Sequence, residues 1–213
     1  MRICLLGPPG SGKGTVAKKI HERYGVPVIE VGSLLREEAS KQTTLGKRIK
    51  KIIESGDLVP DEIALDMFFR KVKDCKKGFV SDGFPRTVME AEELDKWLGK
   101  KGGELDVALY LDVSDKDIIS RLAGRFVCAK CGAIYHEQTI KPKVSGVCDI
   151  CGGKLEKRKD DQPDVIKHRL GVFHKESEPV IAYYEESGVL ETIDGNQSVD
   201  DVIIQVLEEL EVH

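Results

Sequence analysis

The sequence contains no run of apolar residues long enough to cross a bilayer, and the chain passes from Met1 almost directly into a strand-like pattern without signal-peptide architecture. We therefore expect a cytoplasmic location and no membrane partner. Aromatic residues make up only 6% of the chain and are not interleaved with basic residues, while 33 Lys and Arg stand against 37 Asp and Glu. The net charge of −4 argues against a general nucleic-acid binder.

Cysteine is scarce, with six residues in 213, yet four of them form two Cys-x-x-Cys pairs, each followed by glycine. The pairs are Cys128 with Cys131 and Cys148 with Cys151. Short turns of this kind let both thiolates of a pair face one ion, and four thiolates fill a tetrahedral site. Because no position is left for water or substrate, we predict a structural metal, with zinc favoured and iron as the main alternative. Disulfides are disfavoured in the cytoplasmic setting that we expect.

Short apolar runs that are typical of buried parallel strands alternate with helical patterns along the chain. The strand-like runs span residues 3–6, 26–31, 79–81, 107–112 and 189–193. The helical patterns span residues 63–72, 88–98, 166–184 and 199–210. This alternation predicts a three-layer α/β fold, in which a five-stranded parallel sheet is covered by helices on both faces. Ligands are expected at the C-terminal ends of the strands.

Glycine is concentrated after the first of these strands, in the segment GPPGSGKGT at residues 7–15. The glycines let successive backbone N–H groups point at phosphate oxygens, the following helix adds its positive N-terminal end, and Lys13 can reach the terminal phosphates. The predicted nucleotide-binding residues are Gly10, Ser11, Gly12, Lys13, Gly14 and Thr15. Gly14 separates Lys13 from the hydroxyl residue Thr15, which is a variant of the general phosphate-loop pattern.

A second motif, DGFPRT at residues 82–87, follows another strand-like run. Together with the GKGT loop, the GSLLR segment at 32–36 and the RKDD segment at 158–161, it makes the whole chain resemble the adenylate kinases. The resemblance implies a P-loop kinase fold with a core formed by residues 1–31, 61–123 and 162–213. It also implies a helical insertion at 32–60 that binds a nucleoside monophosphate, and a lid at 124–161 that carries the cysteines.

The resemblance further implies reversible, Mg²⁺-dependent phosphoryl transfer from ATP to AMP, and we expect the protein to be a monomer. Transfer between two polyanions needs cations of fixed geometry, and the planar fork of arginine meets this need. Only ten of the 33 basic residues are arginine, yet six of these lie in or beside the motifs. The residues assigned to catalysis are Lys13, Asp82, Arg86, Arg121, Arg125, Arg158 and Arg169. For Arg121 and Arg169 the alternative is ion pairing on a helix surface.

Asp82 is expected to orient magnesium through its waters, with a helix N-cap or turn residue as the alternative. The resemblance adds further ATP contacts at Arg125, Ile134, Tyr135 and Gln197. It places the acceptor nucleotide against Val31, Gly32, Arg36, Asp57, Leu58, Val59, Gly83, Phe84, Pro85, Arg86, Glu90, Arg158 and Arg169.

Two acceptor positions depart from the family pattern: Val31 stands where Thr is usual, and Glu90 stands where Gln reads the AMP base. Ionised Glu offers only acceptors, so it suits the two donors of guanine better than the N1 lone pair of adenine. AMP remains the favoured acceptor, because water, a rotated Glu90 or a protonated carboxyl could restore the adenine contact, and GMP is the alternative. A more remote alternative is a zinc-ribbon nucleic-acid-binding ATPase, against which DGFPRT and the acidic charge balance argue.

Overall fold

The computed structural model describes residues 1–212, and its order of elements interleaves strands with helices. The strands are β1 (Arg2–Leu6), β2 (Val28–Glu30), β3 (Phe79–Asp82), β4 (Val107–Asp112), β5 (Arg125–Cys128), β6 (Ile134–His136), β7 (Leu155–Glu156) and β8 (Leu190–Asp194). The α-helices are α1 (Lys13–Tyr24), α2 (Val31–Ala39), α3 (Thr44–Ser55), α4 (Asp61–Val72), α5 (Val88–Lys100), α6 (Asp115–Ala123), α7 (Pro163–Val172), α8 (Glu178–Glu186) and α9 (Val199–Val212).

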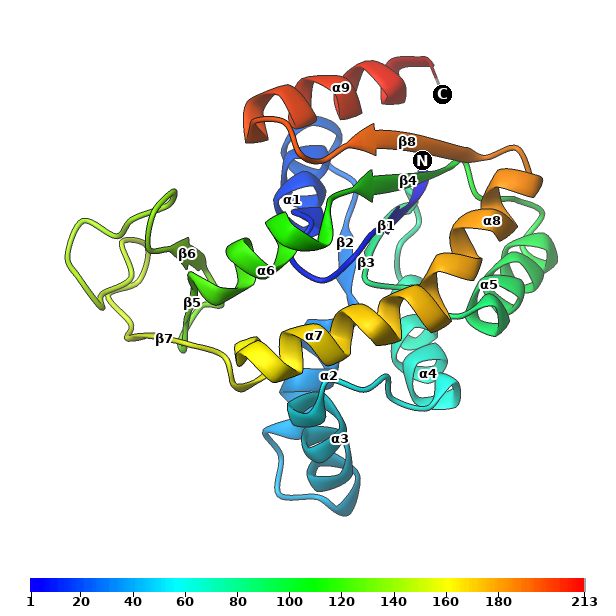
Figure 1. Cartoon of the computed structure of the whole chain (residues 1–213). Helices are drawn as coiled ribbons and strands as arrows, with labels where there is room; N and C mark the ends of the chain where they lie inside the picture. The colour runs from blue at the N-terminus through cyan, green and yellow to red at the C-terminus, as the bar shows by residue number, and fades with distance from the viewer. Residues whose placement is uncertain (213) are drawn as a thin grey trace.

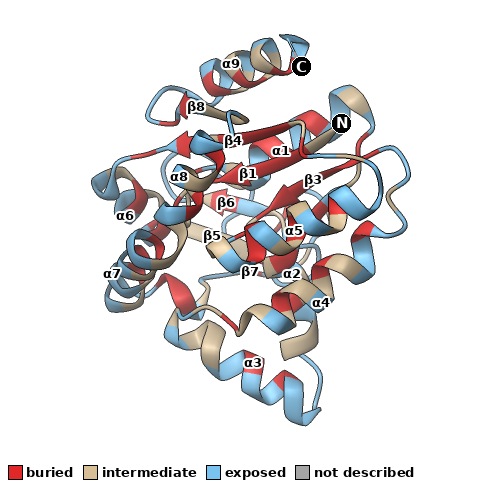
Figure 2. Cartoon of the chain, turned by 90° about the vertical axis from the view of Figure 1, so that its right-hand side faces the viewer, coloured by how far each residue is buried: buried red, intermediate tan, exposed pale blue. Residues whose placement is uncertain are grey.

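The main sheet has five parallel strands, as the sequence predicted, and their order is β2-β3-β1-β4-β8. Side chains of β1 alternate between its two faces: Ile3 and Leu5 pack with helices α1 and α9, whereas Cys4 and Leu6 pack with α4, α5 and α8. Both faces are therefore buried, which is why the strands are apolar throughout. Figure 2 shows this burial along β1, β3 and β4 between the helices.

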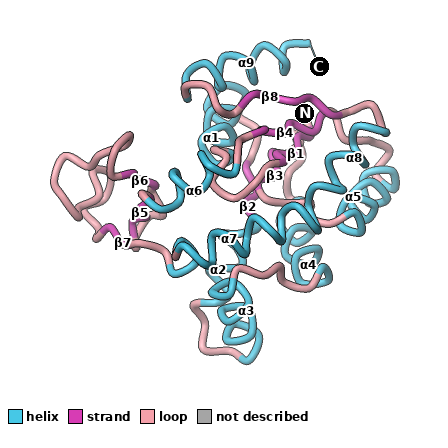
Figure 3. The backbone as a smooth tube through the Cα atoms, in the orientation of Figure 1, coloured by secondary structure: helices cyan, strands magenta, loops and turns pink. Residues whose placement is uncertain are grey.

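Two segments leave this core in Figure 1. The segment that we call the helical insertion (residues 32–60) contains α3 and all of α2 except its first residue, Val31, and α3 projects away from the sheet. Residues 124–161, called the cysteine lobe below, hold a small antiparallel sheet of order β6-β5-β7. Most of this lobe is loop (Figure 3), and its strands were not predicted because they are short and lack a clear apolar alternation.

The helical pattern predicted across residues 166–184 is confirmed, but it contains a π-helical turn that the sequence analysis did not foresee. Helix α7 ends at Val172, a π-helical turn η2 follows at Phe173–Ser177, and α8 begins at Glu178. Pro179 lies in the first turn of α8. Because proline has no N–H to donate to the preceding turn, the regular helix cannot continue through it. Within residues 1–212, no helix is long and apolar enough to cross a membrane.

Candidate active site

The predicted phosphate loop joins β1 to α1 and is closed by Lys13, the first residue of the helix. Gly12, the N-cap residue, has a φ of 101°, a left-handed conformation that favours glycine. The Lys13 ammonium donates to the carbonyl oxygens of Gly7 and Pro8, each at 2.8 Å, and to the Ser11 hydroxyl at 3.2 Å. The lysine therefore lies over the loop, at the positive end of α1, where an anion would bind.

Asp82 faces the phosphate loop from the end of β3, the strand that pairs with β1. Asp82 is only 8% exposed, and this burial raises the pKa of its carboxyl group. Burial likewise lowers the pKa of Lys13 to about 8, although the Asp82 charge opposes this effect. A Cβ atom on Gly14 would lie 3.3 Å from Asp82 Oδ2, so glycine gives the carboxylate room beside the first turn of α1. The close approach of the Asp82 carboxylate to α1 explains why the residue between Lys13 and Thr15 is a glycine.

Three of the predicted arginines converge on two buried carboxylates at the end of the cysteine lobe. Arg125 donates to both oxygens of Asp161, at 2.8 and 2.6 Å, and Arg158 makes the same two-point contact with Asp160. Arg169 reaches the Asp160 carbonyl oxygen at 3.0 Å and Asp161 Oδ1 at 3.2 Å. Burial opposes ionisation of Asp160, but hydrogen bonding and the charge of Arg158, followed by the charge of Arg169, lower its pKa. The aspartates thus act as counter-ions to the arginines.

The remaining predicted arginines are held by different partners. Arg36 Nη2 lies 2.6 Å from Glu30 Oε1, and Arg86 Nε donates to the Gly83 carbonyl oxygen at 2.9 Å. Arg121 Nη2 donates to the carbonyl oxygen of Gly195 at 2.7 Å, beyond the end of β8. Among residues 1–212 no ion pair of Arg121 is found, which disfavours the helix-surface interpretation of this residue.

Most of the residues predicted for the acceptor line one cleft of about 640 Å³ between the helical insertion, the core and the cysteine lobe. Those residues are Val31, Gly32, Arg36, Asp57, Leu58, Val59, Gly83, Arg86, Glu90, Arg158 and Arg169. The lining also includes the apolar side chains of Leu35, Ile53 and Ala64, which sequence reasoning did not name, together with Gly56 and Asp160. The cleft therefore combines a basic part with an apolar part, as a nucleotide requires.

A second cleft of about 550 Å³ lies against the phosphate loop and includes Gly7, Pro9, Lys13 and Pro85 in its lining. The two clefts share Gly56, Leu58, Gly83, Arg86 and Arg169. An anion bound beside Lys13 and a second anion bound in the first cleft would therefore both lie next to Arg86 and Arg169.

The side chains of two predicted contact residues point elsewhere. Phe84 is fully buried and stacks on Phe68, with ring centroids 4.3 Å apart, so its side chain belongs to the core. Tyr135 is 5% exposed and its hydroxyl accepts the backbone N–H of Asp149 at 2.7 Å, inside the cysteine lobe. Contacts of either residue with a nucleotide would have to come from the backbone. Ile134, in contrast, is 50% exposed, and Gln197 lies on the surface after β8.

The acidic residue Glu90 occupies the first turn of α5 and is only 3% exposed. Its Oε2 accepts the backbone N–H of Arg86 at 2.6 Å, and its own N–H is capped by the Thr87 hydroxyl at 3.2 Å. Burial raises the pKa of Glu90 to about 7, despite the N–H of Arg86. Sequence reasoning placed Glu90 at the acceptor but did not foresee that one of its oxygens is engaged by the backbone.

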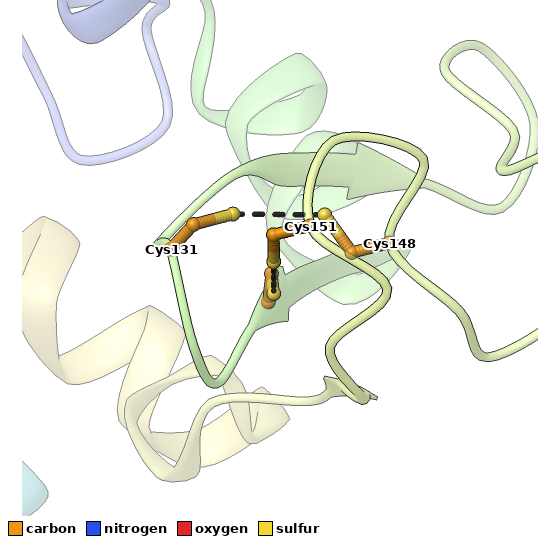
Figure 4. Close-up of side chains that lie close together, drawn as sticks. Cys131, Cys148 and Cys151 are labelled. Carbon is orange, nitrogen blue, oxygen red and sulfur yellow. Dashed lines mark hydrogen bonds between the residues drawn. The ribbon is translucent and has the colours of Figure 1, made fainter.

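The four cysteines of the two pairs come together in the cysteine lobe, with all four sulfur atoms within 4.8 Å of one another. Cys128 Sγ lies 3.5 Å from Cys151 Sγ, and Cys131 Sγ lies 3.6 Å from Cys148 Sγ (Figure 4). These separations are close to the ~3.8 Å expected between thiolates bound tetrahedrally to zinc at about 2.3 Å. The donor set and geometry therefore fit a structural metal ion, and the predicted cluster is confirmed.

The five-stranded parallel sheet, the phosphate loop and the converging basic side chains define a P-loop kinase fold. The family model of adenylate kinases matches residues 5–189. An adenylate kinase of Lachnospira eligens is 46% identical over 209 residues, which cover 97% of this chain and 98% of the relative. An adenylate kinase of Caldicellulosiruptor saccharolyticus is 44% identical over the full length of both chains. The chain belongs to the adenylate kinase family and is a nucleoside monophosphate kinase.

Proposed function

We propose that the protein catalyses reversible, Mg²⁺-dependent phosphoryl transfer from ATP to AMP. The observation that carries the proposal is the junction of the two clefts at Arg86 and Arg169. ATP in the phosphate loop would present its terminal phosphate to this junction, and an acceptor phosphate in the first cleft would approach it from the other side. When two reactants are held in this way, phosphoryl transfer requires little more than neutralisation of the negative charge that spreads over the transferring group in the transition state.

Each basic side chain has a proposed role in this arrangement. Lys13 binds the donor phosphates, Arg36 and Arg86 hold the acceptor phosphate, and Arg121 with Arg169 stabilises the transferring group. Arg125 and Arg158, now paired with buried aspartates, would join this group when the cysteine lobe closes over the nucleotides. Closure would also exclude water, which would otherwise compete as the phosphoryl acceptor.

Asp82 is the proposed outer ligand of magnesium, because its buried carboxylate faces the loop beside Gly14. A bound magnesium ion would neutralise donor phosphate charge. We also propose that the four cysteines hold zinc. Cys₄ sites of this geometry are closed to substrate, so this ion would be structural.

The test is formation of ADP from ATP and AMP. ADP should appear only with Mg²⁺, and in the reverse direction ADP alone should yield ATP and AMP. Absence of both reactions from folded, metal-replete protein would contradict the proposal. Salt-dependent retention on nucleic acid, without ADP disproportionation, would instead favour the remote alternative of a nucleic-acid-binding ATPase.

GMP is the second candidate acceptor, and the specific observation in its favour is the acidic group of Glu90 in the lining of the first cleft. An ionised carboxylate matches the donor-rich edge of guanine. The protonated carboxyl can instead donate to the N1 atom of adenine, which keeps AMP as the first candidate. A panel of AMP, GMP, CMP and UMP with ATP distinguishes the two candidates by their kcat/KM values.

A further inference from the structure

The side chain of Tyr135 is directed at the predicted metal centre and not at a nucleotide. Tyr135 lies in β6 and is one of four buried apolar residues that form the core of the cysteine lobe, together with Cys128, Cys148 and Leu155. Its hydroxyl oxygen lies 3.5 Å from Cys148 Sγ and accepts the backbone N–H of Asp149 at 2.7 Å. Tyr135 thus contacts the sulfur of Cys148 and the backbone of Asp149, the residue that follows Cys148.

The direction of these hydrogen bonds follows from the chemistry of the groups. The Asp149 N–H can only donate, so the phenol oxygen is its acceptor. A cysteine that binds a metal is a thiolate and carries no proton. The single proton of the tyrosine hydroxyl is therefore left to donate to Cys148 Sγ, at a distance suitable for a hydrogen bond to sulfur.

We propose that Tyr135 is a positioning residue of the metal centre, which donates its hydroxyl proton to the Cys148 sulfur and fixes the second cysteine turn through Asp149. The proposal rests on the proposed zinc site. Outer partners of this kind orient metal ligands, and their loss commonly costs 10- to 100-fold in metal affinity. The same contacts tie β6 to the second cysteine turn, so the bound metal would help to hold the exposed Ile134 in place.

The test compares Tyr135→Phe, which removes the hydroxyl and keeps the ring, with the wild type and with Tyr24→Phe. The Tyr24 hydroxyl is a suitable control because it is buried, lies in α1, and has no hydrogen-bond partner among residues 1–212. Zinc-loaded proteins are challenged with a chromogenic chelator. Tyr135→Phe should release zinc about 10-fold faster or more, whereas Tyr24→Phe should match the wild type.

A second measurement separates a hydrogen bond to sulfur from a general effect on folding. In the cobalt-substituted protein, a thiolate that loses a hydrogen-bond donor transfers charge to the metal more easily. The sulfur-to-cobalt absorption bands of Tyr135→Phe should therefore move to longer wavelength. Bands at the wild-type position would overturn the proposal, whether or not zinc is released faster. If the wild type binds neither zinc nor cobalt, the zinc proposal fails as well, and the kinase proposal stays untouched.

Discussion

The carboxylate of Glu90 lies 2.6 Å from the backbone nitrogen of Arg86, within the cleft that we assign to the acceptor nucleotide. One side chain thus holds the turn that carries Arg86, an arginine that we propose to be catalytic, and also lines the cleft. Because Glu90 is buried, it is protonated more readily than an exposed glutamate, and its pKa is raised to about 7. The charge of Glu90 therefore changes close to neutral pH.

The first prediction concerns stability. The ordinary pKa of Glu90 is 4.5, and burial raises it to about 7, so the folded state loses stability as pH rises from 4.5 to 7. Glu90→Gln keeps an oxygen to accept the Arg86 N–H but cannot ionise. It should raise the free energy of unfolding at pH 8, on the order of 2–3 kcal/mol, and change it much less at pH 5. Urea denaturation at both pH values measures this, with Glu93→Gln, at a half-exposed position of the same helix, as control; an equal effect at both pH values would contradict the prediction.

The second prediction concerns base recognition. Protonated Glu90 can donate to adenine N1, whereas the ionised form can only accept from guanine N1–H and N2–H. The ratio of kcat/KM for GMP to that for AMP should therefore rise between pH 6 and pH 8. In Glu90→Gln the ratio should become independent of pH and move towards AMP by about tenfold or more, since a mismatched polar contact costs about 1–3 kcal/mol. An unchanged ratio in the variant would show that Glu90 does not contact the base.

The third prediction tests the junction of the two clefts. Lys13→Ala or Arg86→Ala should lower kcat by roughly 10²- to 10³-fold, because each removes a preorganised positive charge from the transferring phosphoryl group. ADP formation gives the rate, and thermal denaturation verifies that each variant is folded. Arg23→Ala is a matched control, since Arg23 forms an exposed pair with Glu211 at 3.9 Å and lines neither cleft within residues 1–212. Near wild-type turnover in either folded variant would remove its residue from the catalytic set.

The sheet and the phosphate loop could be predicted from the sequence because their signals are local. Continuous apolar runs such as 107–112 identify buried parallel strands, and the spacing of glycine and lysine at 7–15 identifies the loop. The cysteine cluster could be predicted as well, from the spacing of the cysteines within the two Cys-x-x-Cys pairs. Each strand, the phosphate loop and each Cys-x-x-Cys pair is recognised from residues that are close together in the sequence.

The counter-ion roles of Asp160 and Asp161 could not be predicted in the same way. Arg125 and Arg169 lie on different elements from these aspartates, so their convergence depends on how β5 and α7 pack at the end of the cysteine lobe. The orientation of the Tyr135 side chain was not foreseen for a related reason. The resemblance identified the position, but only the fold shows that its side chain turns inward to Cys148.

A fourth prediction follows from two exposed contacts of the helical insertion, one with the cysteine lobe and one with α7. Glu54 and Lys159 lie 2.9 Å apart, and Asp57 Oδ1 lies 2.6 Å from His168 Nε2. The hydrogen bond from His168 lowers the pKa of Asp57, with a smaller effect from Ser55. Because these pairs are exposed, each contributes about 0–1 kcal/mol to holding the first cleft closed.

Lys159→Ala combined with His168→Gln should therefore raise the KM for the acceptor about two- to fivefold, while kcat and the KM for ATP change little. Steady-state kinetics with each substrate varied in turn measures this split. Lys154→Ala is the control, because it breaks an exposed pair with Glu156 at 2.8 Å within the cysteine lobe itself. An unchanged acceptor KM in the double variant would show that the two pairs do not affect closure.

The last prediction concerns removal of the metal. The buried apolar side chains of the cysteine lobe form one small cluster of Cys128, Tyr135, Cys148 and Leu155, and two of these are themselves predicted ligands. Several aliphatic side chains of the lobe are exposed, including Val144 at 61% and Ile150 at 72%. So small an apolar core cannot order the lobe without a crosslink, and a structural metal supplies one.

Chelation should therefore lower the Tm by several degrees or more and expose the cysteine lobe to proteolysis, while turnover at moderate temperature falls much less. Calorimetry, limited proteolysis and elemental analysis of the same preparation measure these effects. Cys75→Ser, at a partly buried cysteine outside the cluster, should keep both the metal and its effect on Tm. Less than half an equivalent of metal in protein purified without chelator, or an identical Tm before and after chelation, would contradict a structural ion. The lobe would then have to be held without a metal, by its backbone pairing and by ion pairs such as that of Arg125 with Asp161.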